Sequence, residues 1–205
     1  RYITMKRLWS LLALVLLQIA QPCVLAEVTN PASGEVTGAK MTVHPDWFKE
    51  SFLDIGEDVS EAADAGKHVI LFMEMNGCPY CYKMNEENFK HAPYKDFIQE
   101  HFEVIALNVK GDREVALNAE NSATEKEIAG ALRVRYTPTL IFLNQENQPV
   151  ARVDGYRNVE DFKLVLDYVQ ERAYENQTLA AHVDARKKTG VYSFREHPRL
   201  QELTD

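Results

Sequence analysis

Cys78 and Cys81 are the residues of this chain whose types and spacing most directly indicate chemistry. Pro79 and Tyr80 lie between them, and the apolar, β-branched run at 68–73 just before them predicts a buried strand. The fixed φ of Pro79 suits the first position of a helix, so Cys78 should cap that helix, where unpaired N–H groups favour its thiolate. Cys81, one turn further on, can attack a mixed disulfide formed at Cys78. The pair therefore predicts a dithiol that exchanges electrons with other proteins.

Two other uses of the cysteine pair need weighing. Half of a zinc site would need two further ligands at suitable spacing, and only Cys23 remains among the cysteines. The six histidines are scattered without such a spacing: His44, His68, His91, His101, His182 and His197. Two buried structural thiols are the other reading, but a Pro-Tyr insert is an unusual way to fill a core. We therefore predict redox use, with no metal and no bound cofactor.

A soft-metal carrier is a further alternative. Met73, Met75 and Met84 lie near the cysteines in sequence, and thiolates together with thioethers suit Cu(I). Methionines beside an apolar strand and on a helix are more often core filler. A third class is a non-catalytic binding module that uses a surface groove and the C-terminal tail.

Residues 1–26 are predicted to be a cleaved signal peptide. Met5 is followed by two basic residues, an apolar run at 8–20 and the small-residue pattern at 24–26. The apolar run is short for a membrane span, and an uncleaved N-terminal anchor is the alternative. Cys23 would leave with the signal peptide. Export would place the remaining dithiol in the periplasm, where disulfides form and must be managed.

The charge of the chain also restricts its partners. The formal charge is −8, and loss of residues 1–26, with three basic and no acidic residues, would change it to −11. An acidic surface argues against nucleic acid and against anionic membrane as partners. With only two cysteines left after processing, a stable covalent dimer would consume the dithiol, so we expect a monomer.

The pattern along the chain predicts one α/β domain with extensions: a flexible lead-in at 27–44, the domain at 45–171, and a C-terminal extension at 172–205 that is helical in part. The extension is expected to be an ordered packing appendage, with a target-binding element as the alternative. Within it, a helix is expected at 176–190, and residues 191–194 and Leu200 are expected to dock on the domain.

Helices and strands are expected to alternate along the domain. The first expected helix opens at Pro45, with Trp47, Phe48, Phe52 and Ile55 on one side, and the second ends at Gly66. The third begins at the cysteines and runs to about Phe89, and a short one follows at 94–98. The last two are capped by Thr124, with Glu127 in a capping box, and by Asn158. The expected strands are 68–73, 102–109, 140–143 and 150–153, and residues 113–123 are left unassigned. The two strand–helix–strand passages predict parallel connections, and the last two strands predict an antiparallel hairpin.

These features together resemble the thioredoxin superfamily over about residues 45–171. The resemblance rests on the strand, the Cys78-Pro79-Tyr80-Cys81 helix start and Thr137-Pro138 before a later strand. It implies a thioredoxin fold, a central mixed sheet flanked by helices. It also implies that Pro138 is cis and faces the dithiol, and that Thr137 and Pro138 form a docking edge for the substrate strand.

More narrowly, the chain is similar to exported thioredoxin-related proteins of bacterial sulfur-oxidation systems (SoxW-like). This similarity lies in the helical lead-in, Gly77 before the first cysteine, Gly111-Asp112, the Thr124 cap and the stretch 136–139. The same tetrapeptide occurs in glutaredoxins, but their Gly-Gly-Asp type turn is not matched at 154–156.

One departure from cytosolic thioredoxins concerns the proton of the second thiol. The buried acid six residues before the first cysteine is replaced by Phe72, and its lysine partner by Ala106. Glu74 is the nearest acid in sequence and is a candidate proton acceptor for Cys81, with a solvated carboxylate as the alternative.

The predicted function is therefore an exported thiol:disulfide oxidoreductase that reduces disulfides of periplasmic proteins. Its catalytic residues would be Cys78 and Cys81, and Pro79, Tyr80, Thr137 and Pro138 would dock the substrate. Tyr80 is expected to be exposed and to contact partners, unless it fills space between strand and helix. The partners would be disulfide-containing exported proteins and a membrane electron donor. A disulfide oxidant or isomerase would use the same residues and is the main alternative.

Overall fold

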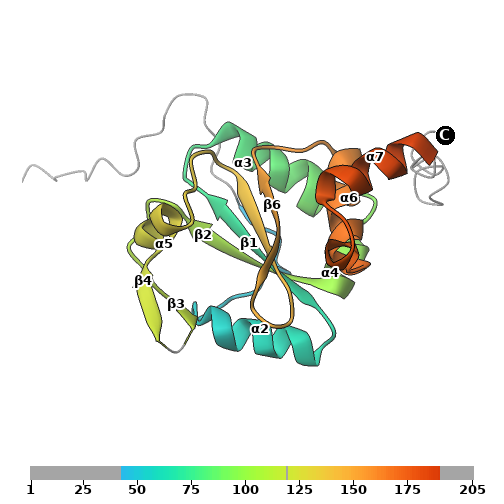
Figure 1. Cartoon of the computed structure of the whole chain (residues 1–205). Helices are drawn as coiled ribbons and strands as arrows, with labels where there is room; N and C mark the ends of the chain where they lie inside the picture. The colour runs from blue at the N-terminus through green and yellow to red at the C-terminus, as the bar shows by residue number, and fades with distance from the viewer. Residues whose placement is uncertain (1–42, 119, 190–205) are drawn as a thin grey trace, which may run out of the picture. The chain divides into compact units, whose positions relative to one another are not determined.

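The computed structural model describes residues 43–118 and 120–189 (Figure 1). The predicted signal peptide, most of the predicted lead-in, and residues 191–194 and Leu200 of the extension lie outside the described residues. No helix within the described ranges is long and apolar enough to cross a membrane.

A four-stranded mixed sheet forms the centre of the domain, in the order β2-β1-β5-β6. Its strands are β1 (His68–Glu74), β2 (Phe102–Asn108), β5 (Thr139–Leu143) and β6 (Pro149–Asp154). β1 and β2 are parallel, as predicted for the first strand–helix–strand passage. The second predicted parallel connection is wrong, because β5 runs antiparallel to β1, and β6 antiparallel to β5. The wrong prediction came from assuming a single crossover helix, whereas a hairpin and a helix separate β2 from β5.

The two faces of the sheet are separated by residue parity. Even-numbered side chains of β1, β2 and β5, such as Phe72 and Phe142, pack with the helices on one face, and odd-numbered ones, such as Met73, pack on the other. The first face is covered by α3 (Pro79–Met84), the π-helical η2 (Asn85–Lys90), α4 (Lys95–His101) and α6 (Val159–Gln170). The second face is covered by α2 (Ile55–Asp64) and α5 (Glu125–Ala131) (Figure 1). We call the first of these the cysteine face, because both cysteines pack there.

The stretch left unassigned from sequence forms a small antiparallel hairpin, β3 (Glu114–Asn118) with β4 (Asn121–Thr124). Thr124 then caps α5, and the predicted capping box is confirmed: Thr124 accepts from the Glu127 N–H, and the Glu127 carboxylate accepts from the Thr124 N–H. The predicted cap of α6 by Asn158 is also confirmed.

The helix predicted to open at Pro45 is absent. Phe48 is buried, but Phe52 is fully exposed, and Leu53 has a φ of 66°, which no helix tolerates. The Lys49 N–H instead donates to the Val104 carbonyl of β2 at 2.9 Å. This bond to the open side of β2 holds the segment outside a helix, and α2 begins only after Asp54.

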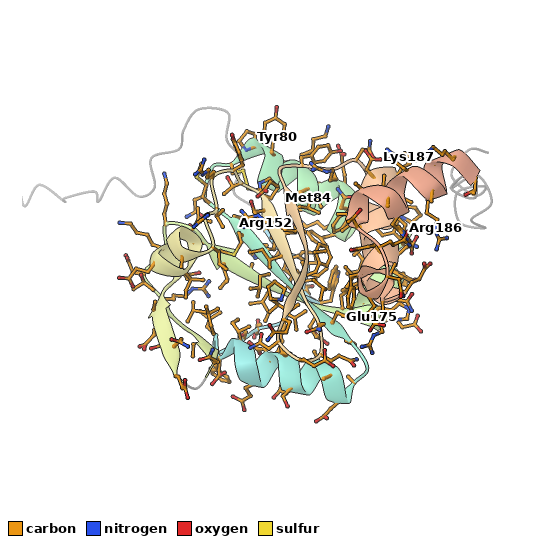
Figure 2. All side chains as sticks on the ribbon, viewed as in Figure 1. Tyr80, Met84, Arg152, Glu175, Arg186 and Lys187 are labelled. Carbon is orange, nitrogen blue, oxygen red and sulfur yellow. A yellow bond between two sulfur atoms is a disulfide. The ribbon has the colours of Figure 1, made fainter. Side chains whose placement is uncertain are left out.

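The C-terminal part of the described chain packs on α6. η3 (Ala173–Glu175) leads to α7 (Leu179–Thr189), whose His182 is buried and packs edge-on against Tyr168, with ring centroids 5.5 Å apart. Lys187 pairs with Asp161 of α6 at 2.7 Å, and Arg186 pairs with Glu171. Figure 2 shows Arg186 and Lys187 on this helix.

Replacement of Phe89 by Ala should destabilise the domain by about 3–5 kcal/mol, because it opens a cavity in the fully buried aromatic cluster of the cysteine face. Phe52→Ala is the matched control and should change the free energy of unfolding by less than about 0.5 kcal/mol. Urea unfolding of both variants checks this. Equal losses would contradict the assignment of Phe52 to the surface.

His182 should make the stability depend on pH. Burial, together with nearby Arg186, lowers its pKa below the usual 6.5, while Glu171 and Asp167 act the other way. The unfolded chain then binds a proton that the folded chain does not, so this contribution is full above pH 6.5 and is lost as the pH falls toward the folded-state pKa. In urea unfolding at pH 7.5 and 5.5, His182→Gln should lose less stability on acidification than the parent. His91→Gln, at an exposed histidine, is the control and should behave like the parent.

Candidate active site

The first cysteine lies where β1 ends and α3 begins. The chain turns through Gly77, whose φ of 75° is a conformation that glycine adopts readily, and the Cys78 N–H donates to the Met75 carbonyl at 3.3 Å. Cys78 has extended backbone angles and caps α3, with Pro79 in its first turn, as the sequence predicts. The helix therefore presents its free N–H groups to the sulfur of Cys78.

Cys78 and Cys81 are joined by a disulfide. The Cys78 sulfur accepts a hydrogen bond from the Cys81 N–H at 3.1 Å, and this donor remains available when the bond is reduced. Cys81 is 0% exposed and Cys78 is 3% exposed. The two sulfurs thus differ: that of Cys78 lies at the helix end, and that of Cys81 is enclosed by the cysteine face.

A loop far along the sequence meets the Cys78 sulfur. The Thr137 hydroxyl donates to it at 3.3 Å, and the Thr137 carbonyl oxygen lies 3.4 Å from it. The peptide bond between Thr137 and Pro138 is cis. The residues predicted from the resemblance are therefore brought together around one sulfur atom.

Hydrogen bonds hold this loop in place on both sides of Pro138. The Pro138 carbonyl accepts from the Gly155 N–H at 2.8 Å. The Thr139 hydroxyl contacts the Tyr136 carbonyl at 2.8 Å and the Asp154 carboxylate at 2.9 Å. A hydrogen-bonded Arg152 guanidinium holds the pKa of Asp154 below its usual value, and the Thr139 hydroxyl adds to this effect. An ionised Asp154 thus keeps the loop in place.

Two exposed tyrosines adjoin the residues of the site in sequence. Tyr80 lies between the cysteines, and Tyr136 immediately precedes Thr137; both are exposed large side chains. Figure 2 shows Tyr80 at the start of α3, pointing away from the sheet. Tyr80 was predicted to be exposed, whereas sequence reasoning gave Tyr136 no role of its own.

Hydrogen bonds hold η2, the continuation of α3, against the loop that follows β6. The buried Asn88 donates to the Arg157 carbonyl at 2.9 Å and accepts from the Tyr94 hydroxyl at 2.6 Å. The Tyr156 hydroxyl contacts the Glu87 carboxylate, and burial, then this carboxylate, raise the pKa of Tyr156 to about 12. These contacts fix η2, which continues directly from α3, relative to the loop that follows β6.

The sheet position beneath the helix is apolar. Phe72 pairs in register with Ala106, so the two residues predicted to replace an acid–lysine pair are indeed neighbours. Glu74 follows Phe72 on the same face and is 9% exposed, so the solvated alternative for this carboxylate is wrong. Its Oε1 lies 2.5 Å from Nε2 of His44. Sequence reasoning missed His44, since it lies 30 residues away in a stretch interpreted as flexible lead-in, and its only signal was the residue type.

Of the three methionines considered as Cu(I) ligands, Met75 and Met84 pack in the same cluster as the cysteines, and Met73 does not. Met73 lies on the opposite face of the sheet from Cys78 and Cys81, and the Met84 sulfur on the cysteine face accepts from Asn88 at 3.3 Å. Among residues 43–118 and 120–189, no group of three or more His, Cys, Asp or Glu side chains is placed to hold a metal ion. Met73 is therefore not placed to join Cys78 and Cys81 in binding a soft metal.

The geometry defines a class of protein. A mixed sheet, a Cys-x-x-Cys disulfide at a helix N-terminus and a cis-proline loop against the first sulfur make up a thioredoxin fold with a dithiol site. The sequence profile of the Thioredoxin-like domain family matches residues 55–170, which is more than half of the chain. The chain therefore belongs to this family. No curated protein sequence matches it.

The chain is similar to several solved structures. A thioredoxin-fold protein from Helicobacter pylori is 21% identical, with a TM-score of 0.54, over 69% of this chain and 99% of that one. A thioredoxin from Thermus thermophilus is 23% identical, with a TM-score of 0.47, over 63% of this chain and 88% of that one. The DsbH oxidoreductase is 18% identical, with a TM-score of 0.42, over 71% of this chain and 97% of that one. At these identities, the likeness to the H. pylori protein concerns the fold alone.

Alkylation should distinguish the two thiols. After reduction, iodoacetamide at pH 7 should modify Cys78 roughly tenfold faster than Cys81, because the helix end and the Thr137 hydroxyl favour the thiolate of Cys78. Mass spectrometry of the cysteine peptides with time measures this ratio. Faster modification of Cys81 would show that the roles of nucleophile and enclosed thiol are reversed.

Proposed function

We propose that this protein is an exported thiol:disulfide oxidoreductase that reduces disulfides of periplasmic proteins. The observation that carries the proposal is the contact of the Cys78 sulfur, at the N-terminus of α3, with the loop of Thr137 and the cis Pro138. This contact combines a stabilised thiolate with a neighbouring backbone segment against which a substrate chain can lie.

The reaction proceeds in two exchanges. The Cys78 thiolate attacks one sulfur of the substrate disulfide, and the other substrate sulfur leaves as a thiolate. Cys81 then attacks the Cys78 sulfur of the mixed disulfide, giving the Cys78–Cys81 disulfide and releasing the second substrate thiol. Two electrons pass from the protein to the substrate. The disulfide form seen here is the product of this cycle, and a thiol donor must reduce it before the next one.

The docking site in this proposal comprises Thr137 and Pro138 together with the exposed Tyr80 and Tyr136. Exposed aromatic rings are frequent anchors in protein interfaces. An extended substrate segment that carries the disulfide would pair with the Thr137 backbone and pack on the two rings, with Pro79 at the helix start beside it.

The cellular setting is part of the proposal. The signal-peptide pattern at 1–26 supports export to the periplasm, and a membrane protein would then donate the electrons. The acidic charge and the two cysteines left after processing support a monomer that acts on exported proteins. Within its family, we place the chain with the exported SoxW-like proteins on the strength of the motifs around Cys78 and Pro138.

The reduction potential of the Cys78–Cys81 pair is the first measurement. The full chain with Cys23→Ser, equilibrated in glutathione buffers, should have a potential near the roughly −270 mV of thioredoxin. It should also reduce the disulfides of insulin with dithiothreitol as donor, and both Cys78→Ser and Cys81→Ser should abolish turnover. A potential above about −180 mV would instead indicate a disulfide oxidant or isomerase. Insulin reduction that persists without the cysteines would overturn the proposal.

A further inference from the structure

Glu74 and His44 form a partly buried pair on the face of the sheet that also carries Cys81. Glu74 is the last residue of β1 and points to the same face as Phe72. Its Oε1 lies 2.5 Å from Nε2 of His44. The His44 ring packs on Phe48 and edge-on against Phe72, with ring centroids 5.2 and 6.3 Å away. The histidine is therefore held in one place, although it comes from the N-terminal end of the described chain.

The start of η2, directly after α3, is hydrogen-bonded to the segment that carries His44. Asn85 is fully buried, lies one turn after Cys81, and donates to the carbonyl of Val43, the residue before His44, at 2.8 Å. Residues four apart share a helix face, so Asn85 and Cys81 point toward the same region. Two oxygen atoms there, Oε2 of Glu74 and Oδ1 of Asn85, are buried with no hydrogen-bond partner among the described residues. Buried polar atoms are rarely left unpaired, and such atoms often indicate a functional role.

The reaction creates a need for a proton acceptor at this place. Cys81 must lose its proton to attack the mixed disulfide, yet it is 0% exposed, and the sheet position beneath it is occupied by Phe72. Glu74 is the acidic residue of β1, and strand alternation from Phe72 and its contact with His44 place it on the cysteine face. A buried carboxylate with a free oxygen can take a proton directly or through one water molecule.

We propose that Glu74 accepts the Cys81 proton and that His44 positions Glu74 and passes the proton to solvent. This proposal rests on the proposed function. In the step, Cys81 gives up its S–H proton to the Glu74 carboxylate while its sulfur bonds to Cys78, and the electron pair of the broken mixed disulfide leaves on the substrate sulfur. The proton then moves from Glu74 to His44, and from His44 to solvent. No further oxidant or reductant is required.

His44 provides the route to solvent. Its side chain is 33% exposed and lines a cleft of about 420 Å³. The other charged groups that line the cleft are Asp46, Lys49, Glu50 and Arg113. Lys49 pairs with Glu61 and Arg113 with Glu125, both at 2.6 Å, and Asp46 and Glu50 are exposed. None of the four forms an ion pair with His44 or Glu74 in the described part of the chain, so the His44–Glu74 pair acts as a unit.

The two exchanges can be followed separately with 5,5′-dithiobis(2-nitrobenzoate). The reduced full chain, with Cys23→Ser, releases one nitrothiobenzoate when Cys78 attacks the probe and a second when Cys81 resolves the mixed disulfide. Stopped-flow absorbance resolves the two releases. At pH 7, Glu74→Gln and His44→Asn should leave the first release unchanged and slow the second, Glu74→Gln by about 100-fold, the lower range of general base catalysis.

The pH profile separates a proton acceptor from a merely structural residue. As the pH rises, hydroxide can remove the Cys81 proton without Glu74, so the second release should recover progressively in both variants. His91→Asn, at an exposed histidine of the same protein, is the matched control and should leave both releases unchanged.

Each outcome decides a separate question. An undiminished second release in both variants, or slowing that is equal at all pH values, would overturn the relay and leave the proposed function standing. If Glu74→Gln does not fold, as judged by circular dichroism, His44→Asn alone gives the same decision. Absence of the first release in the parent chain would overturn the proposed function and the relay with it.

Discussion

The contact between the Cys78 sulfur and Thr137 joins two segments 59 residues apart, and the rest of the domain serves to keep them together. Cys78 lies after the end of β1, at the first turn of α3. Thr137 lies just before the start of β5, the antiparallel neighbour of β1 in the sheet. Since both segments emerge from adjacent strands, the sheet itself sets the separation between the sulfur and the cis peptide. The bonds of Gly155, Thr139 and Asp154 then prevent the loop from moving away.

The pleat of β1 decides what lies beneath the disulfide. Ile70, Phe72 and Glu74 point to the cysteine face, and Val69, Leu71 and Met73 point to the other. A shift of one residue in the register of β1 would exchange these sets and remove both Phe72 and Glu74 from the site. The same alternation places Met73 on the opposite face of the sheet from the cysteines. The chemical character of the site thus follows from the hydrophobic pairing of β1 with β2 and β5.

Local sequence patterns predicted the elements whose stabilising interactions are themselves local. The capping box of Thr124, the Asn158 cap, the apolar run of β1 and the Cys78-Pro79 helix start all act within a few residues, and all are present. The predictions that were wrong concern segments decided by distant partners. The apolar spacing of 45–55 suggested a helix, but the bond from Lys49 to Val104 and the burial of Phe48 among distant rings favour an irregular path. β3 and β4 are short, and Val115 is the one buried residue in them, so their sequence lacked the apolar alternation typical of strands.

The sequence by itself determined that this protein carries a dithiol at a helix start within a thioredoxin-like domain. Both features are encoded by neighbouring residues, because helix capping and strand burial depend on short-range geometry. Only the tertiary structure decided that Thr137 contacts Cys78, that β5 runs antiparallel to β1, and that His44 meets Glu74. These depend on residues separated by 30 or more positions. Such pairs are selected by the packing of the whole core, and no local pattern records them.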